Sequence, residues 1–304
     1  MKYLMMSAAV LTLAACSQET TSGANENDAS AVAETEMADQ VLASERLDAV
    51  LAEQDDEVKA RYEYRHPKET LEFFGVEPGM TVVDSLAGAV WYTGILSDYL
   101  GVDGRVIAAD YSMDMWPLFG GFATEEWIEN RSTWTTDFVA RVDESRDEDD
   151  APVSAIVYGS LPEGMHGTAD VVMMVRATHH FNRFEDDGGF FTEALGDAMN
   201  VLKPGGVLGF VQHRAPEGNS DEWATGDNGY VKQSRIISFV EGAGFELVET
   251  SEVNANPKDV PTEEDIVWRL PPTFGTSEEN PELRAEMEAI GESDRMTLKF
   301  RKPE

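Results

Sequence analysis

Short, strongly apolar runs alternate with helix-length segments across residues 81–212, and this alternation restricts the chain to one class of fold. The runs are TVVD (81–84), RVIAAD (105–110), VSAIV (153–157), DVVMMV (170–175) and GVLGFVQ (206–212). Because they are apolar on both faces, we expect parallel strands covered by helices on both sides. Two later runs, FELVE (245–249) and MTLKF (296–300), are expected to add an antiparallel edge. The sequence predicts an α/β fold with a doubly wound, mainly parallel, seven-stranded sheet.

The segments before the first strand have the period of helices. Apolar residues between Val41 and Val58 recur roughly three to four positions apart, which predicts an amphipathic helix. A second helix is expected to begin at Pro67, since proline suits a first helical position, and to end at Gly75. With the strands, these segments predict one folded domain at residues 41–304, with insertions at 111–150 and 252–294.

The first residues, MKYLMMSAAVLTLAAC, predict export from the cytoplasm. A lysine, an apolar stretch and small residues at the end are the parts of a secretory signal peptide, expected at residues 1–15. Residues 13–16 (LAAC) resemble the lipobox of bacterial lipoproteins, in which the cysteine is lipidated and becomes the new N-terminus. A plain signal peptide with a chance cysteine is the alternative. Cys16 is the only cysteine, so no disulfide or cysteine metal site competes with lipidation.

We therefore expect a protein of the cell envelope that meets the membrane only through its lipid anchor. Ser17 follows the cysteine, which resembles lipoproteins sorted to the periplasmic face of the outer membrane. Residues 16–40 are expected to contain the lipidated cysteine and a disordered acidic linker, because they are small and polar without hydrophobic periodicity. A net charge of −35 argues against nucleic acid and anionic lipid surfaces as partners. The oligomeric state stays open.

The turn after the first strand carries the clearest binding signal. In doubly wound sheets the ligand lies beyond the carboxyl ends of the strands, beside this turn. Asp84 ends the strand, Gly88 lies in the turn, and a helix is expected to begin near Trp91 with its amide dipoles directed at the site. Asp110 ends the second strand, near the spacing of ~20 residues that suits an acid binding ribose hydroxyls. The absence of G-x-G-x-x-G argues against a dinucleotide.

Taken with these residues, several segments resemble class I S-adenosylmethionine-dependent methyltransferases, and within them a group of exported bacterial proteins. LKPGG (202–206) and Asp110 are typical of the superfamily, while NPKD (256–259), VWRLPPT (267–273) and AIGESDRMTLKF (289–300) are typical of the narrower group. The resemblance implies a Rossmann-like methyltransferase fold with S-adenosylmethionine as cofactor. It also implies a cofactor site formed by Asp84, Leu86, Gly88, Trp91, Tyr92, Asp110, Tyr111 and Arg176.

The turn departs from the pattern of the superfamily, because it reads DSLAGAV (84–90) where further glycines are usual. Val90 places a β-branched side chain where the backbone is expected to approach the cofactor, and such a residue avoids positive φ. The sequence therefore predicts weakened or lost cofactor binding, or a shifted loop.

Residues RATHHFNR (176–183) occupy the position where the superfamily places its methyl acceptor. The candidate catalytic residues are His179, His180 and, at the end of the fifth strand, His213. A histidine whose pKa is near neutral can take a proton from a nucleophile as it attacks the methyl group. Two alternatives stay open: His179 only packs the strand end, or the three histidines bind a metal. No acid or cysteine with ligand spacing favours a metal.

Two functions remain in view. The first is an envelope methyltransferase that acts on a small or peptidic acceptor. The second is a non-catalytic binding lipoprotein that retains the methyltransferase fold with an altered glycine turn. Asp84, Gly88 and Asp110 favour the first. Val90 and the export signal favour the second, because S-adenosylmethionine is made in the cytoplasm.

Overall fold

The computed structural model describes residues 26–304, and the chain divides into two units, residues 1–41 and 42–304. The described part of the first unit, residues 26–41, is helical and belongs to α1 (Glu26–Glu53). The predicted signal peptide, Cys16 and Ser17 lie outside the described residues.

α1 begins earlier than the sequence pattern predicts. The pattern predicts a disordered linker through residue 40 and a helix from Val41, whereas residues 26–40 are already helical. This stretch contains neither glycine nor proline and is rich in alanine and glutamate, which have high helix propensity. Intrinsic propensity, rather than an apolar stripe, accounts for this part of the helix.

The second unit is built on one sheet, whose strands lie in the order β3-β2-β1-β4-β5-β8-β7. Strands β1 to β5 pair in parallel along this path, and β8 is antiparallel to both of its neighbours. The short β6 pairs with the end of β5. The strands are β1 (Thr81–Ser85), β2 (Arg105–Asp110), β3 (Val153–Val157), β4 (Ala169–Val175), β5 (Leu202–Ala215), β6 (Val231–Lys232), β7 (Glu246–Ser251) and β8 (Arg295–Arg301).

This order confirms the predicted fold class. The sheet is doubly wound and mainly parallel, with an antiparallel edge, as in the Rossmann-like methyltransferase fold. All seven predicted strands are present, and β5 begins earlier than predicted, at Leu202. A strand that is buried by helices on both faces of the sheet is apolar along its whole length, so such strands can be recognised from composition.

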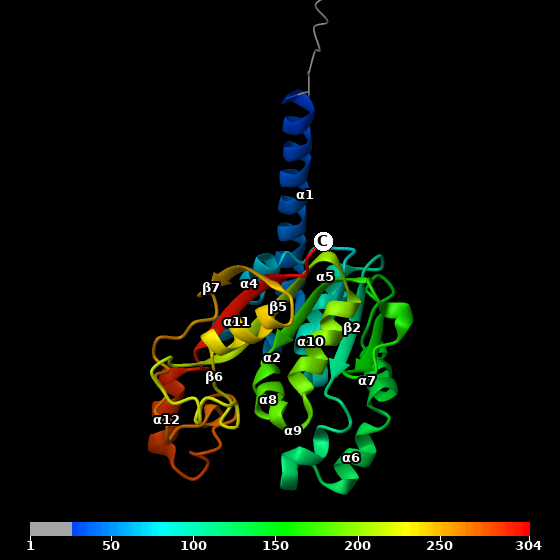
Figure 1. The fold of residues 1–304 in the computed structure, drawn as a ribbon. Helices are drawn as coiled ribbons and strands as arrows, with labels where there is room; N and C mark the ends of the chain where they lie inside the picture. Colours follow the sequence, from blue (N-terminus) through cyan, green and yellow to red (C-terminus); the bar gives the residue numbers. More distant parts are fainter. Residues whose placement is uncertain (1–25) are drawn as a thin grey trace, which may run out of the picture. The chain divides into compact units, whose positions relative to one another are not determined.

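Helices cover both faces of the sheet (Figure 1). The helices after α1 are α2 (Asp56–Lys59), α3 (Tyr62–Arg65), α4 (Pro67–Phe74), α5 (Trp91–Leu100), α6 (Glu125–Arg131), α7 (Trp134–Asp143), α8 (Thr178–Arg183), α9 (Glu185–Gly188), α10 (Phe190–Val201), α11 (Gln233–Gly242) and α12 (Pro281–Ile290). Successive strand residues point to opposite faces, so Val82 belongs to the core cluster that includes residues of α4, α5 and α7, while Val83 belongs to the one that includes residues of α8, α10 and α11.

The predicted limits of α4 are confirmed. Pro67 is its first residue, and Gly75 ends it in the left-handed conformation with φ 75°. Glycine adopts this conformation without a Cβ penalty, so the backbone can turn at once into the segment before β1. Pro67 and Gly75, the two residues from which the sequence predicts the limits of this helix, therefore begin and end it.

Candidate functional site

The strand order creates a crevice between β1 and β4. From β1 the sheet continues through β2, and from β4 it continues through β5, so the connections diverge at the carboxyl ends of these two strands. In doubly wound sheets ligands bind at such a switch point. Asp84 lies on β1 and Arg176 directly follows β4. Two of the predicted site residues therefore flank the crevice.

Asp84 is a buried carboxylate, 3% exposed, and accepts a hydrogen bond from Thr93 Oγ1 at 2.7 Å. Burial raises the pKa of Asp84 to about 6, while the Thr93 hydrogen bond and the charge of Arg176 act in the lowering direction. With a pKa of about 6 the group is mostly ionised at neutral pH. Asp84 can therefore accept further hydrogen bonds from a ligand.

The turn after β1 contains two left-handed residues that are not glycine. Leu86 has φ 59° and Val90 has φ 61°, one on each side of the 3₁₀ helix Ala87–Ala89. The expectation that Val90 avoids positive φ is wrong. A β-branched residue in this conformation stores about 1 to 3 kcal/mol of strain. The turn thus has the backbone shape that glycine normally supplies, although leucine and valine occupy the two left-handed positions.

Gly88 lies in the same turn with space around it. A Cβ added to Gly88 would meet no atom within 4 Å among the described residues. The carbonyl oxygen of Gly88 accepts a hydrogen bond from Arg141 Nη2 at 3.0 Å. Its open side can therefore take a ligand close to the backbone, as the sequence predicts for this position.

Asp110 is paired within the chain. It is 2% exposed, and Arg131 Nη1 lies 3.4 Å from its Oδ2. The Arg131 guanidinium also lies 4.6 Å from the ring centroid of Trp116 and 4.9 Å from that of Trp127. Burial raises the pKa of Asp110 to about 6, against the lowering effect of Arg131. Arg131 comes from α6 in the predicted insertion, and sequence reasoning missed it because no spacing rule links it to Asp110.

Tyr111 and Tyr92 are both buried beside the strand ends. The Tyr111 hydroxyl donates to the carbonyl oxygen of Ala177 at 3.0 Å and lies 2.9 Å from His180 Nδ1. Tyr92 packs edge-to-face on Trp91, and burial raises the pKa of Tyr92 to about 12. Tyr111 therefore connects the end of β2 to α8, whereas Tyr92 stays a neutral hydroxyl beneath Trp91.

The three candidate histidines lie together in front of β4 and β5. The ring centroid of His179 is 4.0 Å from that of His180 and 5.5 Å from that of His213. Gln212 Oε1 accepts from the backbone N–H of His179 at 3.2 Å and lies 3.3 Å from its Nδ1. His213 Nδ1 lies 2.5 Å from Ser293 Oγ. The structure thus brings together residues that the sequence only predicts to share a rim.

The chemistry of these histidines differs from the expectation of a near-neutral pKa. Burial lowers the pKa of His179 to about 4, and burial also holds the pKa values of His180 and His213 well below the usual range. All three rings are neutral at pH 7 and are weak bases. Neutral rings of this kind can orient a ligand by hydrogen bonds. The expectation failed because the low pKa values come from burial, which the sequence does not reveal.

Two cavities near the crevice share Arg176 and Pro272 in their walls. The larger has a volume of about 810 Å³, and its further lining includes Arg61, Arg65, Val90 and Trp91. The smaller has a volume of about 100 Å³, and its further lining includes His213, Trp268, Glu292, Ser293 and Arg295. Of the three candidate histidines, His213 is the one that lines this smaller cavity.

Residues 267–273 and 289–300 contribute to the walls of these cavities, and residues 256–259 hold them in place. Asn256 Nδ2 donates to the carbonyl oxygens of Ile290 and Glu292, at 2.9 and 2.6 Å. Asp259, 5% exposed, accepts from Arg269 Nη2 at 2.8 Å and from the backbone N–H of Asp294 at 3.0 Å. NPKD therefore fastens the other two segments, which carry Pro272 and Glu292 into the cavity walls.

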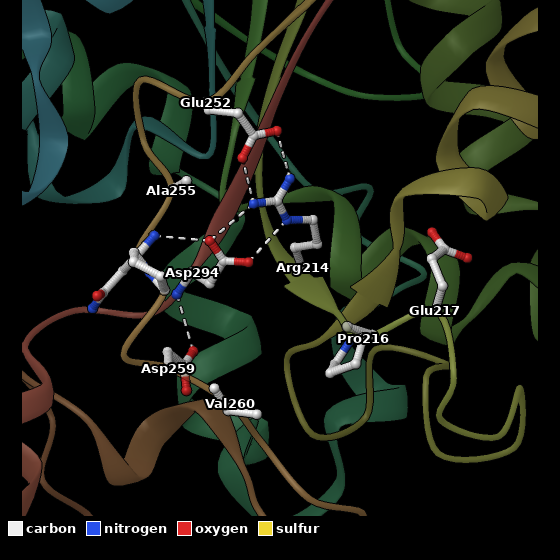
Figure 2. A pocket seen from close by; sticks show the side chains of 11 residues that line it. Arg214, Pro216, Glu217, Glu252, Ala255, Asp259, Val260 and Asp294 are labelled. Atoms are coloured by element: carbon white, nitrogen blue, oxygen red, sulfur yellow. Dashed lines mark hydrogen bonds and ion pairs between the residues drawn. The ribbon is translucent and has the colours of Figure 1, made fainter.

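A third cavity, of about 580 Å³, lies at the end of β5 (Figure 2). Arg214 enters it and donates to both oxygens of Glu252, at 2.9 and 2.7 Å, and to both oxygens of Asp294, at 2.8 and 3.1 Å. Since neighbouring strand residues point to opposite faces, Arg214 and His213 line different cavities. The positive charge of Arg214 in this third cavity is therefore already paired with the carboxylates of Glu252 and Asp294.

Two further properties concern the described part of the chain alone. Within residues 26–304, no helix has the length and apolar character that crossing a membrane requires. No three histidine, cysteine, aspartate or glutamate side chains in that same range are grouped as a metal ion would need.

No protein-family model and no curated protein matches the chain. Among solved structures, it is similar to a SAM-dependent methyltransferase from Aquifex aeolicus, with 21% identity over 68% of this chain and 93% of that one and a TM-score of 0.45. It is similar to an arsenic(III) S-adenosylmethionine methyltransferase from Chlamydomonas reinhardtii, with 16% identity over 85% and 73% of the two chains and a TM-score of 0.42. Phosphoethanolamine N-methyltransferase 2 from Haemonchus contortus gives 15% identity over 79% and 53%, with a TM-score of 0.45. These similarities concern the fold alone. The fold class itself follows from the strand order of this chain.

Proposed function

We propose that the chain binds S-adenosylmethionine at the carboxyl ends of β1 and β2 and transfers its methyl group to an acceptor in front of β4. The observation that carries the proposal is the pair of buried carboxylates, Asp84 and Asp110, on adjacent strand ends beside the switch point. Ligands bind at this place in doubly wound sheets, and an acid at the end of the second strand suits ribose hydroxyls.

The residues at this site fit the cofactor, provided that the ion pair between Asp110 and Arg131 breaks when it binds. The left-handed turn from Leu86 to Val90 and the free side of Gly88 supply a backbone that a ligand can approach closely. Asp84 is an ionised acceptor. Arg131, however, holds the Asp110 carboxylate at 3.4 Å, so ribose hydroxyls and this guanidinium compete for one acceptor.

S-adenosylmethionine supplies a methyl group on a positively charged sulfur, which an oxygen, nitrogen or sulfur nucleophile can attack. The chain itself would bind and orient the reactants. Asp84 and Asp110 would accept hydrogen bonds from the cofactor. Tyr111 directly follows β2, and Trp91 begins the helix after the turn. His213 lines the small cavity as a neutral ring, so it would orient an acceptor by a hydrogen bond.

A second candidate function is a non-catalytic binding lipoprotein that keeps the fold. The Asp110–Arg131 pair favours it, because a buried carboxylate that is satisfied within the chain needs no ribose. Strain at Val90 also favours it, since a β-branched residue holds a left-handed conformation in the turn where a cofactor-binding loop would have glycine.

Calorimetric titration with S-adenosylmethionine and S-adenosylhomocysteine separates the two functions. We expect both to bind, Asp110→Ala to weaken binding by about ten- to a hundredfold, equivalent to ~1.5 to 3 kcal/mol for hydrogen bonds to a charged group, and Arg131→Ala to strengthen it. Arg146→Ala is the matched control, because Arg146 pairs with the half-exposed Asp143 away from these strand ends. No heat from the wild type and from Arg131→Ala would leave only the binding lipoprotein.

We also propose that Cys16 is lipidated and holds the protein in the cell envelope, on the periplasmic face of the outer membrane. The signal-like residues 1–15, the LAAC ending and Ser17 support this. Cys16→Ser is expected to move the protein from the membrane fraction to the soluble or unprocessed pool. Immunoblots of fractions after a high-salt wash measure this, and a variant that stays with the membranes would contradict lipidation.

A further inference from the structure

Four arginines converge on one buried carboxylate at the wall between the two cavities. Glu292 is 1% exposed and forms ion pairs with Arg61, Arg65 and Arg295. Arg176 lines both cavities and lies close enough to lower the pKa of Glu292. The four arginines come from three distant parts of the sequence, at residues 61–65, 176 and 295.

The charges of this cluster do not balance. Four guanidinium groups meet one paired carboxylate, Glu292, and the carboxylate of Asp84 lies near enough for Arg176 to lower its pKa, so positive charge remains in excess. The nearby Tyr92 is neutral because its pKa is about 12. Burial, with Arg65 and Arg295 adding to it, lowers the pKa of Arg176 to about 9. Keeping like charges together and partly desolvated is costly unless a counter-charge is bound. Four arginines lie together here with too few carboxylates, although the chain has 58 acidic and only 23 basic residues.

The unmatched hydrogen-bonding atoms of the cluster are all donors. Four buried atoms lack both a hydrogen bond and an ion pair within the described chain, namely Nε of Arg61, Arg176 and Arg295 and Nε1 of Trp91, while Nε of Arg65 has only its ion pair with Glu292 at 3.4 Å. Guanidinium and indole groups donate and do not accept, so only an acceptor can satisfy them. Buried polar groups normally have partners, so four unpaired donors in one place indicate a site for an acceptor.

Arg176 is the member of the cluster best placed to meet a ligand. Glu292 pairs with the other three arginines, whereas within residues 26–304 the Arg176 side chain has neither an ion pair nor a hydrogen bond. Its backbone is held at φ 56°, a strained conformation, by the hydrogen bond from its N–H to the carbonyl oxygen of Val211 at 2.7 Å. The strand end thus fixes a free guanidinium between the two cavities.

We propose that Arg176, with Arg65 and Arg295 beside it, binds the oxyanion of a small organic ligand, a phosphate or a carboxylate. The guanidinium fork matches the geometry of either group. The larger cavity, of about 810 Å³, leaves room for an organic body against Trp91, Val90 and Pro272. The oxyanion site stands on the arginines alone, whereas naming its ligand as the methyl acceptor rests on the proposed function.

The test is thermal unfolding and calorimetry of the full chain with inorganic phosphate or acetate, against sodium chloride at matched ionic strength. We expect at least one of the two oxyanions to raise the unfolding temperature of the wild type. Arg176→Gln should weaken its binding by about tenfold or more, the loss of one charged hydrogen-bonding group. A response to phosphate alone assigns a phosphate, a response to acetate alone assigns a carboxylate, and both support the shared chemistry. No response to either overturns the proposal.

Arg176→Gln also distinguishes a binding residue from a structural one. Without an oxyanion, this variant should unfold at the same temperature as the wild type or higher, because it removes an unpaired charge from a crowded cluster. A lower unfolding temperature without oxyanion would show a structural role and contradict the proposal. Arg146→Gln, at an exposed ion pair, is the control and should keep the full oxyanion response.

A competition experiment separates this inference from the proposed function. If the oxyanion belongs to the acceptor, saturating S-adenosylhomocysteine leaves the response to phosphate or acetate intact. Mutual exclusion would contradict that assignment, since the arginines would then hold the cofactor itself. A chain that binds oxyanions but no S-adenosylhomocysteine would refute the proposed function while keeping the oxyanion site.

Discussion

Glu292→Gln is expected to lower the free energy of unfolding by about 3 to 5 kcal/mol, because breaking a buried ion pair leaves uncompensated charges in the interior. Glu292 is 1% exposed and is the carboxylate to which Arg61, Arg65 and Arg295 bind. Urea denaturation measures the effect. Glu288→Gln is the matched control, since Glu288 forms an exposed pair with Arg284 and should change stability by less than about 1 kcal/mol. Equal stability of the two variants would contradict the cluster.

The same residue gives the wild type a defined pH dependence. Burial alone raises the pKa of Glu292, but the surrounding arginines lower it to about 2, from an ordinary value of 4.5. A carboxyl whose folded pKa is depressed stabilises the protein fully above its unfolded pKa. The contribution of Glu292 should therefore fade as the pH falls from about 4.5 toward about 2, and Glu292→Gln should lack this part of the acid destabilisation.

Asp259→Ala is expected to cost about 3 to 5 kcal/mol of unfolding free energy as well, for the same physical reason. The carboxylate is 5% exposed and holds Arg269, the Tyr230 hydroxyl and the backbone N–H of Asp294. Its loss should also loosen the cavity wall, which limited proteolysis of residues 252–294 would detect. The exposed Asp221, paired with Lys232, supplies the control Asp221→Ala, and a matching small effect at Asp259 would argue against a fastened wall.

The sheet was predictable because burial on both faces leaves a mark in composition. Val82 and Val83 pack against opposite helix layers, so both had to be apolar, and the same holds along β4. Pro67 and Gly75 likewise act through their own backbone, independent of distant residues. Residues 26–40 form a helix without amphipathic periodicity, so the sequence pattern predicts a linker there, and intrinsic propensity accounts for the difference.

The sequence predicts some residues of the candidate site and does not reveal others. Asp84 and Asp110 were found from their positions at strand ends, which is a local property. Arg131 was missed because it reaches Asp110 from an insertion, through contacts with tryptophan rings. The arginine cluster was missed because Arg61 and Glu292 are 231 residues apart. The segment AIGESDRMTLKF (289–300), quoted for the family resemblance, contains Glu292 and Arg295, but nothing in its sequence indicates that arginines from elsewhere in the chain meet there.

We propose that S-adenosylmethionine binds at the carboxyl ends of β1 and β2, and a crystal structure of the chain grown with saturating S-adenosylhomocysteine tests this proposal. We expect density for the ligand beside Gly88, with ribose hydroxyls bonded to Asp110 and Arg131 withdrawn from that carboxylate. Density that leaves Arg131 on Asp110 and no ligand beside Gly88 would contradict the claim and leave a binding lipoprotein with a methyltransferase fold.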